Sequence, residues 1–147
     1  MEWLEFAIKM SEYSPHPTTQ VGAVLVTDDD HVWGCNDFPR GYHMVVGDVG
    51  VDVSEPSEQR TMHMIHAEQM AICNAAALGI RTWGATIYQT IMPCCECAKA
   101  IIQAGIAEVA VDGDLADAYK SDRYTPQFVE SLRMFDHNKV TFRKVYR

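Results

Sequence analysis

Two short segments of the chain carry side chains that together could hold a metal ion. They are His66-Ala67-Glu68 and, beginning 25 residues after Glu68, Pro93-Cys94-Cys95-Glu96-Cys97. The imidazole of His66 and the thiolates of Cys94 and Cys97 make three ligands, one fewer than a closed tetrahedral zinc site needs. An open fourth position can hold water, which is typical of a catalytic zinc site. The pattern therefore predicts one Zn2+ ion bound by His66, Cys94 and Cys97.

Glu68 lies two residues from the first of these ligands and is predicted to be the catalytic residue. Zinc lowers the pKa of a bound water from about 16 to about 7. A carboxylate at this position can take a proton from that water and later deliver protons to a substrate. The order H-x-E, then P-C-x-x-C, is typical of zinc enzymes that replace the exocyclic amine of a nucleobase by a carbonyl and release ammonia.

Helix starts are expected to position these ligands. Cys94 and Cys97 are three residues apart, which places them on one face of a helical turn, and Pro93 suits the start of that helix. The N-terminus of a helix also favours thiolates. His66 precedes a second predicted helix, so two helix starts could hold the metal between them. A non-enzymatic alternative remains open, because a C-x-x-C pair also occurs in structural zinc-binding modules.

Composition indicates what the partner is. The chain has 147 residues and a formal net charge of −8, from 12 basic and 20 acidic residues. Proteins that hold polynucleotides normally present a basic groove. We therefore expect a small-molecule substrate and no polynucleotide partner.

Localisation follows from the absence of targeting signals. No apolar run reaches the roughly 20 residues that span a bilayer, and the N-terminal Met1-Glu2-Trp3-Leu4-Glu5 has no basic region typical of a secretion signal. The five cysteines are an odd number, which fits a reducing compartment. A cytoplasmic protein without membrane contact is expected.

Hydrophobic patterning predicts an α/β protein with a mixed sheet. Together with the H-x-E and P-C-x-x-C motifs, this leads us to expect a single zinc-dependent deaminase domain over residues 1–147. A leading helix is expected over 2–13 and a long loop over 36–63. The loop is expected to be functional because compact domains seldom have plain connections of that length. The remaining expected elements are strands over 21–26, 31–35, 85–91, 106–112 and 140–145, and helices over 67–78, 94–104 and 125–137.

About 100 residues of the chain resemble the deoxycytidylate (dCMP) deaminases of the cytidine deaminase-like superfamily. Four stretches carry the resemblance: Thr18 to Val26, Cys35 to Gly41, the His66 motif, and Ile87 to Ile106. The resemblance implies a three-layer α/β/α fold with a five-stranded mixed sheet and zinc at two helix starts. It also implies conversion of dCMP to dUMP with release of ammonia, and a homo-oligomer, either hexamer or dimer.

The resemblance further suggests substrate-binding residues. Asn36 matches an asparagine that contacts the nucleotide in relatives, and Ala67 lies inside the His66 motif. Arg40 could pair with a phosphate through two hydrogen bonds. A simple turn at Asn36 and Pro39 is the alternative interpretation.

Two departures from the family pattern leave other substrates open. Asp37 stands where relatives have glycine, and Met70 stands where they have asparagine. The alternatives are a modified deoxycytidine nucleotide, a nucleoside, or a free base such as guanine.

Overall fold

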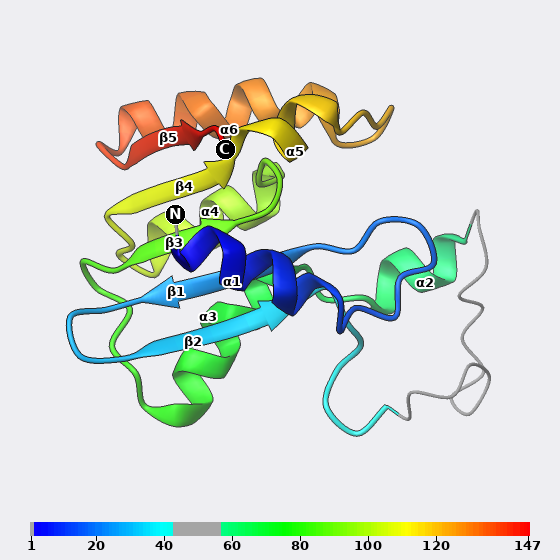
Figure 1. Ribbon diagram of the computed structural model, residues 1–147, viewed down its shortest axis with the longest axis horizontal. Coiled ribbons are helices and arrows are strands. Elements are labelled where there is room, and N and C mark those ends of the chain that lie inside the picture. Colours follow the sequence, from blue (N-terminus) through cyan, green and yellow to red (C-terminus); the bar gives the residue numbers. More distant parts are fainter. Residues whose placement is uncertain (1, 43–56) are drawn as a thin grey trace.

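Residues 2–42 and 57–147 are described by the structure, which is a computed structural model (Figure 1). Their strands form a five-stranded sheet in the order β2-β1-β3-β4-β5. In chain order these are β1 (Gly22–Val26), β2 (His31–Cys35), β3 (Thr86–Gln89), β4 (Glu108–Asp112) and β5 (Thr141–Val145). β1 pairs antiparallel with β2 and β3, whereas β4 pairs parallel with β3 and β5. The sheet is therefore mixed, as predicted.

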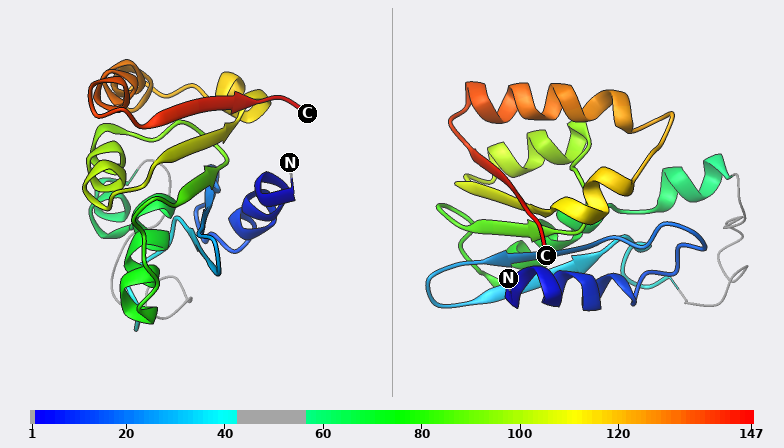
Figure 2. Two further views of the ribbon diagram at one scale, coloured as in Figure 1. Left: turned by 90° about the vertical axis from the view of Figure 1, so that its left-hand side faces the viewer. Right: turned by 45° about the horizontal axis from the view of Figure 1, so that its top comes forward.

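Helices cover both faces of this sheet. Helix α1 (Glu2–Ser11) lies on one face, and α3 (Ala67–Leu78), α4 (Cys95–Gln103) and α6 (Thr125–His137) lie on the other (Figure 2). Two shorter helices, α2 (Glu58–His63) and α5 (Gly113–Ala118), precede α3 and follow β4. The predicted three-layer α/β/α fold is confirmed. None of the helices in residues 2–42 and 57–147 combines the length and the hydrophobicity of a transmembrane span.

The central strands form the rigid base of the molecule. Leu25, Ile87 and Val109 lie on β1, β3 and β4 and are fully buried. Burying a side chain of this size contributes about 1.5–3 kcal/mol relative to leaving it exposed. The chain leaves the buried strand β3 and reaches Cys94 within five residues of Gln89, so the core holds the segment that carries the thiols.

Close packing against β2 positions the first turn of α3. A Cβ atom at Gly34 would lie 2.6 Å from the carbonyl oxygen of Ala67 and 2.6 Å from the amide nitrogen of Ala71. A side chain at position 34 would therefore push the helix away from the sheet. Because glycine allows this close approach, the backbone of β2 sets the position of His66 and Glu68 at the start of α3.

The element boundaries differ from the predictions in small ways. The helix predicted over 2–13 ends at Ser11, and the strand predicted over 85–91 is Thr86–Gln89. The loop predicted over 36–63 contains α2, and residues 43–56 of that loop lie outside the described part of the chain.

The helices α2 and α5 were not predicted from the sequence. Each has 6 residues and begins at a polar cap. The Ser57 hydroxyl accepts a hydrogen bond from the Arg60 amide, and the Asp112 carboxylate accepts one from the Leu115 amide. Segments of this length are too short to show a helical repeat of apolar residues, so the caps are the signal that could have revealed them.

Candidate active site

The three predicted metal ligands meet where α3 and α4 begin. His66 is the N-cap of α3 and Cys94 is the N-cap of α4, with Cys97 in its first turn. The Nδ1 atom of His66 lies 3.4 Å from Sγ of Cys94 and 3.4 Å from Sγ of Cys97. All three ligand atoms lie within 4.8 Å of one another. Two helix starts therefore bring the donors together, as the spacing predicts.

This donor set fits zinc. Bonds of about 2.3 Å to sulfur and about 2.0 Å to nitrogen place tetrahedral ligands roughly 3.5 Å apart. The nitrogen–sulfur distances of 3.4 Å are close to that value. One imidazole and two thiols are also the ligand types that zinc prefers, and three protein ligands leave one position for water or substrate.

Hydrogen bonds among the ligands favour a thiolate at Cys94. A hydrogen bond from the Cys97 side chain, and a further one from His66, lower the pKa of the Cys94 thiol to about 4. The same bond to Cys94, together with burial, raises the pKa of Cys97. The pKa of His66 is raised because its ring bonds to Cys94. The cluster thus stabilises a negatively charged sulfur at neutral pH, as a metal ligand requires.

Glu68 is buried next to this cluster, with 3% of its surface exposed. The amide nitrogen Nε2 of Gln89 lies 3.3 Å from Oε1 of Glu68 and 2.8 Å from the carbonyl oxygen of Ile91, and donates to both. Burial raises the pKa of Glu68. Removal from water makes the protonated carboxyl group easier to form, so Glu68 can hold a proton during a reaction.

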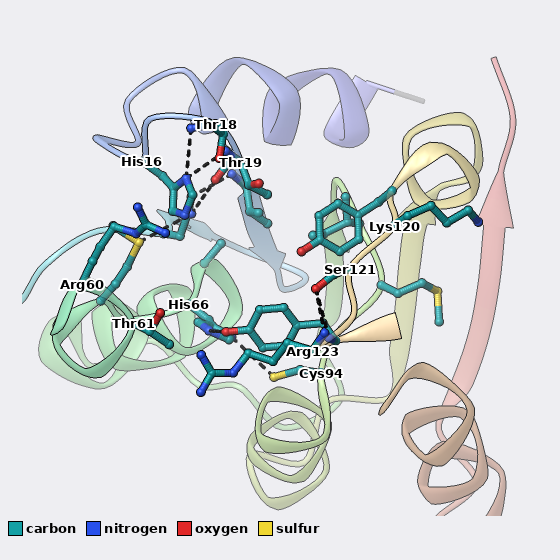
Figure 3. Close-up of a pocket in the computed structure, with 18 of the residues that line it drawn as sticks. His16, Thr18, Thr19, Arg60, Thr61, His66, Cys94, Lys120, Ser121 and Arg123 are labelled. Atoms are coloured by element: carbon teal, nitrogen blue, oxygen red, sulfur yellow. Dashed lines mark hydrogen bonds between the residues drawn. The ribbon is translucent and has the colours of Figure 1, made fainter. Parts of the chain in front are cut away.

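A cavity of about 590 Å³ opens above the cluster and is lined by His66, Ala67, Glu68 and Cys94 among others. In Figure 3, His16 and Arg60 lie on one side of it and Ser121 and Lys120 on the other, with His66 and Cys94 between them. Cavities of this size accommodate small organic ligands.

Among the described residues, three cationic side chains line this cavity, although the chain as a whole is acidic. They are Arg60, Lys120 and Arg123. Arg60 is 5% exposed, whereas Lys120 and Arg123 are exposed. Glu58, Glu68 and Asp122 line the same cavity, so these cations are individual contact points for an anionic ligand and do not make the whole cavity positive.

The structure separates the three predicted substrate residues. Asn36 and the fully buried Ala67 line the cavity, whereas Arg40 is exposed and is not among the described lining residues. The side-chain oxygen of Asn36 accepts from the Val21 amide at 2.8 Å, and its nitrogen donates to the Thr19 carbonyl at 2.8 Å. Asn36 therefore holds the 19–21 segment in place through both ends of its amide group.

The C-terminal helix α6 braces the turn that carries the thiols. Gln127 accepts a hydrogen bond from the Cys95 amide at 3.1 Å, and the buried hydroxyl of Ser131 donates to the Pro93 carbonyl at 2.9 Å. The Cys95 thiol donates to the Gln127 carbonyl at 3.4 Å and so points away from the ligand cluster.

The sequence interpretation did not identify the cavity cations or the bracing residues on α6. A polar and aromatic run, residues 119–124, leads from α5 at the end of β4 into α6. In α/β proteins, ligands bind at the carboxyl ends of parallel strands. The position of this run after β4 is therefore the signal that could have pointed to Lys120, Arg123 and Tyr124.

The sequence is similar to known deaminases. Residues 1–112 match the family described as the cytidine and deoxycytidylate deaminase zinc-binding region. A probable deoxycytidylate deaminase from Drosophila melanogaster is 34% identical over 140 residues, which cover 89% of this chain and 64% of that protein. The human deoxycytidylate deaminase is 31% identical over 152 residues, covering 98% of this chain and 80% of that protein. The chain thus spans a little under two thirds of the insect relative.

A solved structure has the same fold. The dCMP deaminase of the cyanophage S-TIM5, in complex with dCMP and dUMP, aligns with a TM-score of 0.73 over 98% of this chain and 94% of that chain, at 22% identity. The family match over residues 1–112 includes the zinc-binding region in which His66, Glu68, Cys94 and Cys97 lie. The chain therefore belongs to the cytidine and deoxycytidylate deaminase family.

Proposed function

We propose that the chain is a zinc-dependent hydrolytic deaminase that converts dCMP and water to dUMP and ammonia. One observation carries the proposal: the buried carboxyl group of Glu68 lies beside the His66, Cys94 and Cys97 cluster at a cavity large enough for a nucleotide. Its relatives named deoxycytidylate deaminase support the choice of substrate. These relatives do not favour the alternatives, which are a modified deoxycytidine nucleotide, a nucleoside, a free base such as guanine, or a purely structural zinc module.

The proposed roles follow from the positions of the side chains. His66, Cys94 and Cys97 hold the zinc ion, which when bound supplies an activated water at neutral pH. Glu68 takes the two protons of the attacking water in turn, and it delivers one to the ring nitrogen and the other to the leaving amine. Gln89 keeps the Glu68 carboxyl oriented through its amide N–H.

We further propose that the cavity cations recognise the 5′-phosphate. Arg60, Lys120 and Arg123 line the same cavity as Glu68. Arginine and lysine bind phosphate through charge-assisted hydrogen bonds. Asn36 and Ala67 border the rest of the nucleotide in this proposal, and the sequence-based prediction for Arg40 stays a prediction.

A substrate panel tests the proposal. Ammonia release is measured with dCMP, 5-substituted dCMP, dCTP, deoxycytidine, cytosine, adenine and guanine, on protein whose zinc content has been determined. We expect dCMP to have the highest kcat/KM and one zinc per chain. Better turnover of a nucleoside or a free base would refute the nucleotide assignment, and zinc without turnover of any compound would favour the structural module.

Three further proposals come from the sequence analysis. Residues 1–147 act as one deaminase domain, supported by the continuous sheet from β2 to β5. The chain forms a homo-oligomer, either hexamer or dimer, and light scattering after gel filtration measures its mass. It does not bind polynucleotides, so a gel shift with single-stranded DNA or tRNA at low salt should show little binding.

A further inference from the structure

The two ring nitrogens of His66 have different neighbours. Nδ1 lies 3.4 Å from the sulfur atoms of Cys94 and Cys97. Nε2 lies 3.5 Å from the hydroxyl oxygen of Tyr124. Because Nδ1 faces the other ligands, it is the nitrogen that would bind the metal, and Nε2 then carries the proton. A neutral imidazole has one donor and one acceptor nitrogen, so Nε2–H needs an acceptor.

We infer that Tyr124 is the residue that positions His66 for zinc, with its hydroxyl oxygen accepting a hydrogen bond from Nε2–H. Histidines that bind metals almost always donate their other N–H to such an acceptor, which fixes the tautomer and the ring orientation. The ring of Tyr124 meets the His66 ring edge to face, with 5.5 Å between centroids and 79° between planes. Tyr124 therefore restrains the imidazole through both its hydroxyl group and its ring.

A network of hydrogen bonds holds Tyr124 in this position. The Ser121 hydroxyl accepts from the amides of Arg123 and Tyr124 at 3.3 and 3.1 Å. Ser121 and Thr125 are joined by two further bonds, one from the Thr125 amide to the Ser121 carbonyl at 3.0 Å and one from the Ser121 amide to the Thr125 hydroxyl at 2.9 Å. The turn before α6 is thus fixed at four points. A tyrosine on such a turn loses little entropy when it restrains His66.

The same helix contacts the other half of the metal cluster. Gln127 and Ser131 bond to the backbone of Cys95 and Pro93, on either side of Cys94. The N-terminal half of α6 and its N-cap residue therefore support both the imidazole and the thiol segment. These three supporting residues all lie beyond residue 112, where the family match ends. The inference rests on the proposed zinc site but assigns a role to a residue that the ligand motif does not contain.

The test is zinc affinity, measured by competition with a chromophoric chelator on wild type, Tyr124→Phe and Tyr119→Phe. Tyr119→Phe is a matched control, because Tyr119 lines the same cavity but its ring packs on Phe128, with 6.1 Å between the ring centroids. Loss of such a support typically weakens metal binding about 10- to 100-fold. We expect Tyr124→Phe to raise the Kd for zinc by about 10-fold or more. Tyr119→Phe should leave this Kd within about 2-fold of the wild-type value.

Two further readouts exclude a general loss of structure. The melting temperature of the metal-free protein should shift equally in both variants. The visible absorption of the cobalt-substituted protein, which reports ligand geometry, should change only in Tyr124→Phe. Equal zinc affinity in wild type and Tyr124→Phe would overturn the inference while leaving the proposed function intact. Failure of the wild type to bind zinc would overturn both.

Discussion

The family-matched residues 1–112 and the remaining residues 113–147 contribute to the site in different ways. The first region supplies His66, Glu68, Cys94 and Cys97, which are mostly buried and lie on elements packed against the central sheet. The second supplies side chains that surround them, from a loop and a helix at the edge of the molecule. Strand β1 is buried along most of its length, whereas β5 is largely exposed.

This difference reflects what each region must do. A metal ligand must have a particular donor atom, so the first region depends on residue type. A supporting hydrogen bond can come from any polar group with the right geometry, as Gln127 and Ser131 illustrate. Removing a ligand should therefore abolish metal binding, whereas removing one supporting hydrogen bond should only lower the affinity for the metal.

The largest effect is expected at a ligand. Cys97→Ala leaves two ligands and should reduce zinc to near zero per chain, with loss of ammonia release. Cys95→Ala is the matched control, since that thiol bonds to the Gln127 carbonyl and not to the cluster. Elemental analysis of purified protein measures both. Full zinc retention in Cys97→Ala would remove this residue from the ligand set.

The next effect concerns Glu68. Glu68→Gln keeps the size of the side chain but cannot transfer protons in the same way, so kcat should fall by about 10² to 10⁴. Zinc content should remain at one per chain, because Glu68 is not among the three ligands. Steady-state ammonia assays and metal analysis are the measurements. Normal turnover in this variant would contradict the proposed mechanism.

A smaller effect is expected at the brace from the second region. Ser131→Ala removes the buried hydroxyl that donates to the Pro93 carbonyl. Leaving a buried group without its partner costs about 1–3 kcal/mol of unfolding free energy. Zinc should also dissociate faster, because the thiol segment is less restrained. Urea unfolding and chelator-induced zinc release measure the two effects, and unchanged zinc release would confine Ser131 to a role in stability.

The smallest effect is expected at the exposed cations. Lys120→Ala and Arg123→Ala should raise KM for dCMP several-fold at low salt, and by less at high salt, where exposed charges are screened. KM for deoxycytidine should change little, because deoxycytidine has no phosphate. Arg40→Ala provides the comparison, since Arg40 was predicted from the sequence but lies outside the described cavity lining. If Arg40→Ala alone reduced the preference for dCMP over deoxycytidine, Arg40 would replace Lys120 and Arg123 as the proposed phosphate-binding residue.

The amino-acid sequence was sufficient to predict the donor atoms and the order of most elements, and it led to the proposed class of reaction. These were predictable because they depend on residue type and on short spacings, such as the three residues from Cys94 to Cys97 within one helical turn. The three-layer fold and the zinc-binding family were confirmed. The ligand cluster lies together as predicted, and its role in catalysis stays a prediction until it is measured.

The side chains that surround the cluster became evident only from the three-dimensional fold. Tyr124 lies 58 residues from His66 in the chain, yet the two side chains are in contact. Arg60 and Lys120 come from segments on opposite sides of the cavity, whereas Arg40, close to Asn36 in sequence, lies outside the lining. Local patterns do not encode such contacts, because they depend on where α6 and the 119–124 loop pack against the sheet. That packing is set by the whole core and not by any single motif.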